Sequence, residues 1–262
     1  MPRHGASALL SAADSRTASL VRRFILAAAF LFGWRVLGEL ASSPLDGGQP
    51  AAALAQQLRW GTIILSGLMI LFVCRKFQAL AAILASALFW HFENALLAAG
   101  RERDHCYIMP VILLFCYGAT GLLHRSTEAE EFSWEICCAV VGAVYTMAGL
   151  SKLHYSGLGW INSYYLRLLT AGEIPWSSGL LLRIRSVLAG SPAFAWAASA
   201  GTLIIELSGV LMVWPSSRPY YTAALLCLHA GIFLSTGIIW PDHILLIAAL
   251  GFPLDRPSRA AA

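Results

Sequence analysis

Apolar runs long enough to cross a bilayer recur along this chain, with short polar turns between them. A membrane-spanning helix needs about 20 consecutive, mostly apolar residues, and shorter runs are tolerated when helices pack together. On this basis we predict eight spans, of which the second and the eighth have the weakest pattern. They are Phe24–Ala41, Trp60–Cys74, Phe77–Ala99, Tyr107–Leu123, Trp134–Leu153, Phe194–Trp214, Tyr220–Trp240 and His243–Pro253.

The composition excludes a soluble fold. Hydrophobic residues make up 58% of the 262 residues, and charged residues only 12%, about half of their share in a soluble domain. Because a soluble protein must cover much of its exterior with polar groups, the chain is predicted to be an all-α polytopic membrane protein in contact with membrane lipid. Its net charge of +4 is spread out, so we expect no nucleic-acid partner.

The domain organisation is predicted to be simple. Residues 1–20 are polar and small and should form a flexible tail, residues 21–254 a single transmembrane domain, and residues 255–262 a C-terminal tail. Arg22 and Arg23 precede the first apolar run, which has the features of either a signal peptide or a retained helix. Since the rest of the chain is also membranous, we expect a retained first helix.

Lysine and arginine in short loops predict the orientation. Arginines near the N-terminus and the Arg75–Lys76 turn are expected on the cytoplasmic side. The segment from His154 to Pro192 departs from this rule, since it carries Arg167, Arg183 and Arg185 on the predicted outer side. The stretch "INSYYLRLLTAGEIPW" within it predicts an interfacial amphipathic helix between the fifth and sixth spans.

Lys152 closes the fifth span, in "YTMAGLSKLHYSGLGW". One interpretation is snorkelling, in which the stem stays in lipid and the ammonium reaches the headgroups. The other is functional: Tyr145, Gly149 and Lys152 share a helix face, and a lysine in a dry pocket can act as a base. His105, in the loop "GRERDHCY" on the same predicted face of the membrane, is either solvated or a proton donor or acceptor.

Other ionisable residues also lie within apolar runs, where a charge is expensive. Glu206 has either a structural hydrogen bond or a direct role, and His229 is read as a packing residue or a functional one. Glu93 is a further candidate, and Arg35 and Glu39 are expected to neutralise each other. The sequence contains no nucleotide-binding, zinc-protease or serine-hydrolase signature. The six cysteines form no CxxC pair, so we predict neither a disulfide framework nor a metal site.

At these residues the sequence resembles the vitamin K-dependent gamma-carboxylase family and its bacterial relatives, the horizontally transferred transmembrane domain (HTTM) proteins. "YTMAGLSKLHYSGLGW" resembles the lysine motif of the family, "DHCYIMPVILLF" the segment with an oxygenation histidine, and "LIIELSGVLMVW" the acidic span, with glutamate in place of aspartate. The resemblance covers roughly Phe24 to Leu250. It implies that Lys152 and His105 are catalytic and that Tyr145, Gly149, Trp160, Glu206 and His229 form the quinone pocket.

The family's chemistry implies the cofactors. A reduced quinone of the vitamin K or menaquinone type would lose a proton to Lys152 and react with O2. The basic oxygenated product would abstract a proton from a small-molecule or peptide substrate, and the carbanion would capture CO2, with no metal involved. Since the chain ends at Ala262, we expect no counterpart of the luminal domain of the vertebrate carboxylases. Quinol oxygenation with another acceptor is therefore expected in place of protein carboxylation.

Two other classes of function remain open. One is a non-catalytic membrane partner, either an electron-transfer or an assembly subunit. The other is a small-solute transporter, in which Glu206, His229 and Glu93 would line a polar path. We expect an integral membrane protein with a cytoplasmic N-terminus and an active face on the outer, periplasmic or luminal side.

Overall fold

The computed structural model describes residues 4–42, 52–74, 77–98, 108–123, 129–162, 167, 179–237 and 239–252. Over these residues the chain is all-α, with short turns and no strand. The elements are α1 (His4–Ser42), α2 (Ala52–Val73), α3 (Gln78–Ala98), α4 (Ile108–Leu123), α5 (Ala129–Ser156), η2 (Gly157–Trp160), α7 (Gly179–Gly190), α8 (Pro192–Leu207), η3 (Ser208–Met212), α9 (Arg218–Thr236) and α10 (Pro241–Gly251).

Four stretches of helix are long and apolar enough to cross a membrane: Leu54–Val73, Gln78–Ala98, Glu130–Trp160 and Pro192–Met212. They coincide with the second, third, fifth and sixth predicted spans. Helices also occupy the other four predicted spans, and two of these, Met109–Leu123 and Pro241–Gly251, are shorter apolar helices. The structure is therefore compatible with an integral membrane protein, while the count of eight spans stays a prediction.

Two features bear on the predicted domain organisation, which stays a prediction. α1 begins at His4, within the segment that was expected to be a flexible tail. The stretch after Pro2 is rich in alanine and leucine, which favour helix. The chain also divides into two compact units where one domain was predicted. One unit comprises Met1–Cys137 and Pro241–Ala262, and the other comprises Cys138–Trp240.

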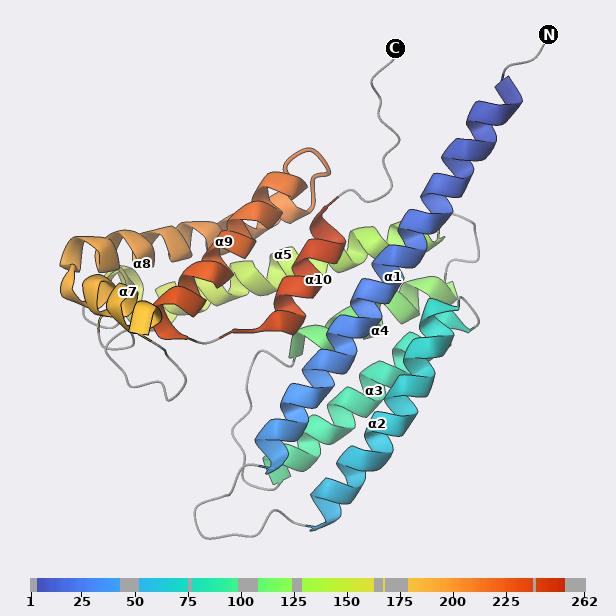
Figure 1. Ribbon diagram of the computed structural model, residues 1–262, viewed down its shortest axis with the longest axis horizontal. Helices are drawn as coiled ribbons and strands as arrows, with labels where there is room; N and C mark the ends of the chain where they lie inside the picture. Colours follow the sequence, from blue (N-terminus) through green and yellow to red (C-terminus); the bar gives the residue numbers. More distant parts are fainter. Residues whose placement is uncertain are drawn as a thin grey trace. The chain divides into compact units, whose positions relative to one another are not determined.

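The first unit is a set of neighbouring helices in which α10 packs on α1, α1 on α2, α2 on α3, and α3 on α4 (Figure 1). Trp34 of α1 lies in its core, with ring centroids 5.2 Å from Phe89 and 4.9 Å from Phe92 of α3. The indole N–H donates to Thr62 Oγ1 of α2 at 3.0 Å. Three helices are thus held by one side chain that satisfies both apolar packing and hydrogen bonding.

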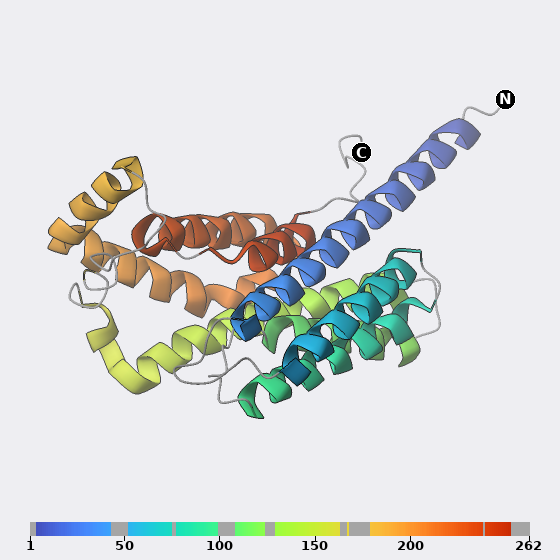
Figure 2. The ribbon, with the colours of Figure 1, turned by 60° about the horizontal axis from the view of Figure 1, so that its bottom comes forward.

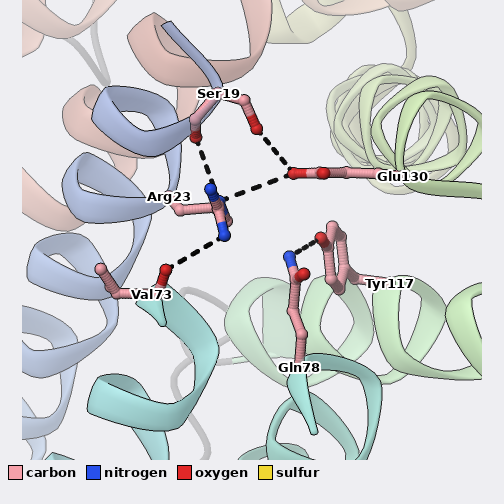
Figure 3. A network of polar contacts seen from close by, with 6 residues as sticks. All are labelled: Ser19, Arg23, Val73, Gln78, Tyr117 and Glu130. Carbon is pink, nitrogen blue, oxygen red and sulfur yellow. Dashed lines mark hydrogen bonds and ion pairs between the residues drawn. The ribbon is translucent and has the colours of Figure 1, made fainter. Parts of the chain in front are cut away.

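A buried arginine organises the polar part of the same unit (Figure 3). Arg23 is 3% exposed, and its guanidinium donates to the carbonyl oxygens of Ser19 at 3.2 Å and Val73 at 3.0 Å. Glu130 Oε1 lies 3.6 Å from Arg23 Nε and accepts a 2.8 Å hydrogen bond from the Ser19 hydroxyl. Nearby, Gln78 donates to the Tyr117 hydroxyl. These contacts tie the start of α5 to α1 and the end of α2.

Several arginine side chains donate hydrogen bonds to the backbone carbonyl groups at the ends of other helices. The last four carbonyls of a helix have no partner within the helix, and they form the negative end of its dipole. Five arginines donate to such carbonyls in the described residues: Arg22 to Ala249 of α10, Arg23 to Val73 of α2, Arg167 to Ala189 of α7, Arg185 to Ser235 of α9, and Arg218 to Met212 of η3. These guanidinium groups therefore stabilise the C-terminal ends of helices within the fold.

The second unit contains the rest of α5 followed by η2, α7, α8, η3 and α9 (Figure 2). α9 packs against α7, α8 and η3, and α7 packs against α8. α8 changes to the tighter 3₁₀ helix η3 at Ser208, immediately after Leu207. This unit contains every described residue of the predicted lysine motif and acidic span.

Candidate functional site

Lys152 and Glu206 form an ion pair in the second unit. Lys152 Nζ, from α5, donates to Glu206 Oε1, from α8, at 2.6 Å. The exposed fractions of the two side chains are 23% and 9%. Charges taken out of water require compensation by an opposite charge or by hydrogen bonds, and this pair supplies both. The pair is electrically neutral as a unit, and it contains both a proton donor and a carboxylate that can accept a proton.

The partner of Lys152 distinguishes between the two interpretations of this residue. Glu206 lies within the candidate span Pro192–Met212 and Lys152 within Glu130–Trp160, each more than one helical turn from either end. A snorkelling lysine directs its ammonium towards the headgroups. Here the ammonium is instead directed to a carboxylate of a neighbouring helix. The geometry therefore favours the paired lysine over the snorkelling one.

A glycine turn places Trp160 over the lysine. Gly157 has φ +56°, a conformation that side chains disfavour, and it begins the 3₁₀ turn η2 at the end of α5. The turn brings the Trp160 ring to 5.2 Å, centroid to Nζ, from Lys152, within the range of a cation–π contact. The indole N–H is buried and has no hydrogen-bond acceptor among the described residues. A polar group of a ligand could accept it.

Glycines allow α5 and α8 to approach each other at the pair. A Cβ atom at Gly149 would lie 3.1 Å from Glu206 Cβ and 3.0 Å from Leu207 Cδ2. Further along, Gly142 of α5 and Gly209 of η3 are in backbone contact, since a Cβ on either would collide with the carbonyl oxygen of the other. Glycine–glycine contacts of this kind are how membrane helices achieve close packing.

Tyr145 and His229 form a second polar pair in this unit. The Tyr145 hydroxyl lies 2.6 Å from His229 Nε2 of α9, and the two residues are 8% and 5% exposed. The His229 ring also meets Trp240 edge-on, with centroids 5.8 Å apart. Tyr145 and Lys152 are two helical turns apart on one face of α5, so α5 carries both polar pairs.

The other predicted residues lie elsewhere or outside the described residues. His105 and most of "INSYYLRLLTAGEIPW" are outside them, as is the side chain of Glu39, the predicted partner of Arg35. Glu93 is buried in α3 of the first unit. Among the described residues, no group of three or more His, Cys, Asp or Glu side chains could hold a metal ion.

Sequence reasoning missed the residues that set the geometry around the pair. Gly142 was not singled out, although it lies seven residues before Gly149 on the same face of α5, a spacing that indicates a packing stripe. Gly209 was noted only because it shares a helix face with Thr202 and Glu206, and its contact with Gly142 was not predicted. Tyr221 of α9, whose hydroxyl donates to the Ile205 carbonyl at 3.0 Å, gave no comparable signal. Its role depends on where α9 packs, which no local pattern specifies.

No protein-family model, curated protein or solved structure matches this chain. The resemblance to the carboxylase family therefore rests on the three motifs alone, and what it implies for function stays a prediction.

Proposed function

We propose that this chain is an integral membrane enzyme that deprotonates and oxygenates a reduced quinone. The observation that carries the proposal is the 2.6 Å contact between Lys152 Nζ and Glu206 Oε1, within two apolar helices. Supporting it, six of the seven residues assigned to the site by the resemblance lie in one unit around this pair and the Tyr145–His229 pair. They are Tyr145, Gly149, Lys152, Trp160, Glu206 and His229.

The pair provides a route for the quinol proton. Lys152 passes its proton to Glu206 Oε1 along the existing hydrogen bond, and the neutral amine then takes the phenolic proton from the quinol. The outcome is a lysine ammonium, a neutral Glu206 carboxyl group and a quinol anion that the ammonium stabilises. The protein gains one positive charge in this step, and the quinol anion balances it. An unbalanced charge would be costly in a medium of low dielectric constant.

The overall reaction balances as quinol plus O2 giving quinone epoxide plus water. The substrate is a quinol of the vitamin K or menaquinone type, which is lipid-soluble and reaches the site through the bilayer. His105 is proposed to assist oxygenation, and Tyr145, Gly149, Trp160, Glu206 and His229 to form the pocket. Coupling to proton abstraction and capture of CO2 by a small-molecule or peptide substrate is part of the same proposal, because the oxygenated product is a strong base only where water is excluded.

The membrane topology is part of the same proposal. We propose eight spans, a cytoplasmic N-terminus, and a site on the outer, periplasmic or luminal side, with an interfacial helix between the fifth and sixth spans. The number and position of the positive residues around the first two spans support this orientation.

The test is quinol epoxidation. Purified protein in nanodiscs receives reduced menaquinone or vitamin K under O2, and epoxide is measured by mass spectrometry. We expect epoxide from the wild type and a loss of about 100-fold or more for Lys152→Ala, the scale typical of a lost general base. Lys76→Ala, which removes the only other lysine of the chain, is the matched control and should retain activity.

Absence of epoxide from folded wild-type protein with both quinols would contradict the proposal. It would support the alternative of a non-catalytic membrane partner that has the same helix arrangement.

A further inference from the structure

The helix α7 is too short to cross a membrane, yet it is joined directly to a helix that can. Its residues Gly179–Gly190 extend over about 18 Å at 1.5 Å per residue, against a hydrocarbon core about 30 Å thick. Only Ser191 separates α7 from α8, where Pro192–Met212 is a candidate span. The C-terminus of α7 must therefore lie at the level where α8 enters the membrane.

The exposed face of α7 is unsuited to water. Leu180 and Val187 are 74% and 70% exposed, and the exposed Arg183 lies between them on one helical stripe. Arg185 points the other way: it is only 2% exposed and donates to the Ser235 carbonyl at 3.0 Å. A helix surrounded by water buries its large aliphatic side chains and exposes its arginines, whereas α7 exposes three large aliphatic residues, with Leu182 49% exposed, and buries one arginine.

Exposed aromatic residues mark the same end of the second unit. Phe194 and Trp196, at the start of α8, are 41% and 58% exposed, and Figures 1 and 2 both show α7 folding back beside the start of α8. Aromatic side chains collect at the boundary between hydrocarbon and headgroups. Their position at the α7–α8 turn indicates that this turn lies at that boundary.

We propose that α7 lies in the interface of the bilayer and binds anionic phospholipid. Leu180 and Val187 reach the upper acyl chains, and the Arg183 guanidinium contacts a lipid phosphate, for which its planar fork of donors is well suited. Anionic headgroups attract basic side chains at a membrane surface. Arg183 is exposed, whereas Arg167 and Arg185 donate to the helix carbonyls of Ala189 and Ser235. This inference is independent of the proposed quinol chemistry.

The test is spin-label accessibility in the full-length protein, with the native cysteines replaced. Single labels are placed at Leu180, at Val187 and, as a control on the packed face of the same helix, at Leu188. In nanodiscs of phosphatidylcholine and phosphatidylglycerol, oxygen partitions into lipid and a nickel chelate stays in water. We expect the labels at Leu180 and Val187 to relax with oxygen and to be shielded from nickel. Full access to nickel would overturn the proposal, as would shielding from both reagents, which would show that another protein surface covers α7.

The lipid charge is tested separately. Spin-labelled phosphatidylglycerol should be immobilised by the protein in preference to spin-labelled phosphatidylcholine, and Arg183→Gln should reduce this preference while Arg183→Lys largely restores it. An unchanged preference in Arg183→Gln would overturn the phosphate contact. Quinol epoxidation measured on the same samples reports on the proposed activity separately, so the failure of one proposal is distinguishable from the failure of the other.

Discussion

At the scale of single residues, two polar pairs carried by α5 define the candidate site. Lys152 pairs with Glu206, and Tyr145 pairs with His229. Each pair places a polar group that would be costly in an apolar environment against a partner on another helix. The pairs therefore contribute to the packing of α5 on α8 and α9 as well as to the proposed chemistry.

Removing one partner of the ion pair should cost more than removing both. Lys152→Met and Glu206→Met each leave a buried group without its counterion, and we expect each to destabilise the protein by about 1–3 kcal/mol. The double variant should be closer to the wild type than the sum of the two single variants. The measurement is a double-mutant cycle by denaturant unfolding in detergent micelles. Additive effects would show that the two side chains are not coupled.

The hydroxyl of Tyr145 can be removed without changing the shape of the ring. Tyr145→Phe deprives His229 Nε2 of its 2.6 Å partner, so we expect a loss of about 1–3 kcal/mol. Tyr155→Phe, at an 83% exposed tyrosine on the same helix, is the control and should change the unfolding free energy by less than about 0.5 kcal/mol. Equal effects of the two variants would contradict a specific role for the buried hydroxyl.

At the scale of helices, glycine contacts set the separation of α5 from α8 and η3. Gly142 and Gly209 touch through their backbones, and Gly149 faces Glu206 and Leu207. The change from α8 to the 3₁₀ helix η3, which starts two residues after Glu206, directs Gly209 towards α5. The position of Glu206 relative to Lys152 thus depends on residues that carry no side chain.

Alanine at Gly209 should force the helices apart. Its Cβ would collide with the Gly142 carbonyl and the Thr146 hydroxyl, so we expect Gly209→Ala to destabilise the protein by about 1–3 kcal/mol and to reduce disulfide formation between cysteines placed at Lys152 and Glu206. Gly201→Ala is the matched control, because a Cβ at Gly201 in α8 meets nothing within 4 Å. It should be neutral or slightly stabilising. Similar behaviour of the two variants would exclude the glycine contact as the determinant.

The sequence predicted the helices better than the contacts between them. Apolar runs identified every described helix except α7, and the spacing of Tyr145, Gly149 and Lys152 identified the face of α5 that carries the site. The partners of these residues, Glu206 and His229, were singled out by their cost inside a span, but which residue each would meet depends on tertiary packing. The arginines show this limit most clearly. In the sequence Arg185 is one of the positive charges between two predicted spans, whereas in the structure it donates to the carbonyl of Ser235 at the end of α9.

At the scale of the whole molecule, the described residues form two compact units, and the single transmembrane domain stays a prediction. The C-terminal helix α10 returns to pack on α1, so the ends of the sequence belong to the same unit while Cys138–Trp240 forms the other. Local hydropathy contains no information on such a return. The candidate site is contained in the second unit, and the Arg23–Glu130 network in the first.

The proposed topology can be tested with reporter fusions. At the Arg75–Lys76 turn, only a reporter that works in the cytoplasm should be active. Beside His105, only a reporter that works after export should be active. This alternation is expected because α2 and α3 are both candidate spans and positive residues stay on the cytoplasmic side. The same side for both insertions would contradict the spanning assignment of α3.

The central claim is that the Lys152–Glu206 pair takes up the proton of a bound quinol. The most direct measurement is an infrared difference spectrum of the protein in nanodiscs, recorded as reduced menaquinone binds in the absence of O2. We expect loss of a carboxylate band and appearance of a protonated carboxyl band that is missing in Glu206→Gln but present in the control Glu131→Gln. A spectrum in which quinol binds and Glu206 stays ionised would contradict the claim.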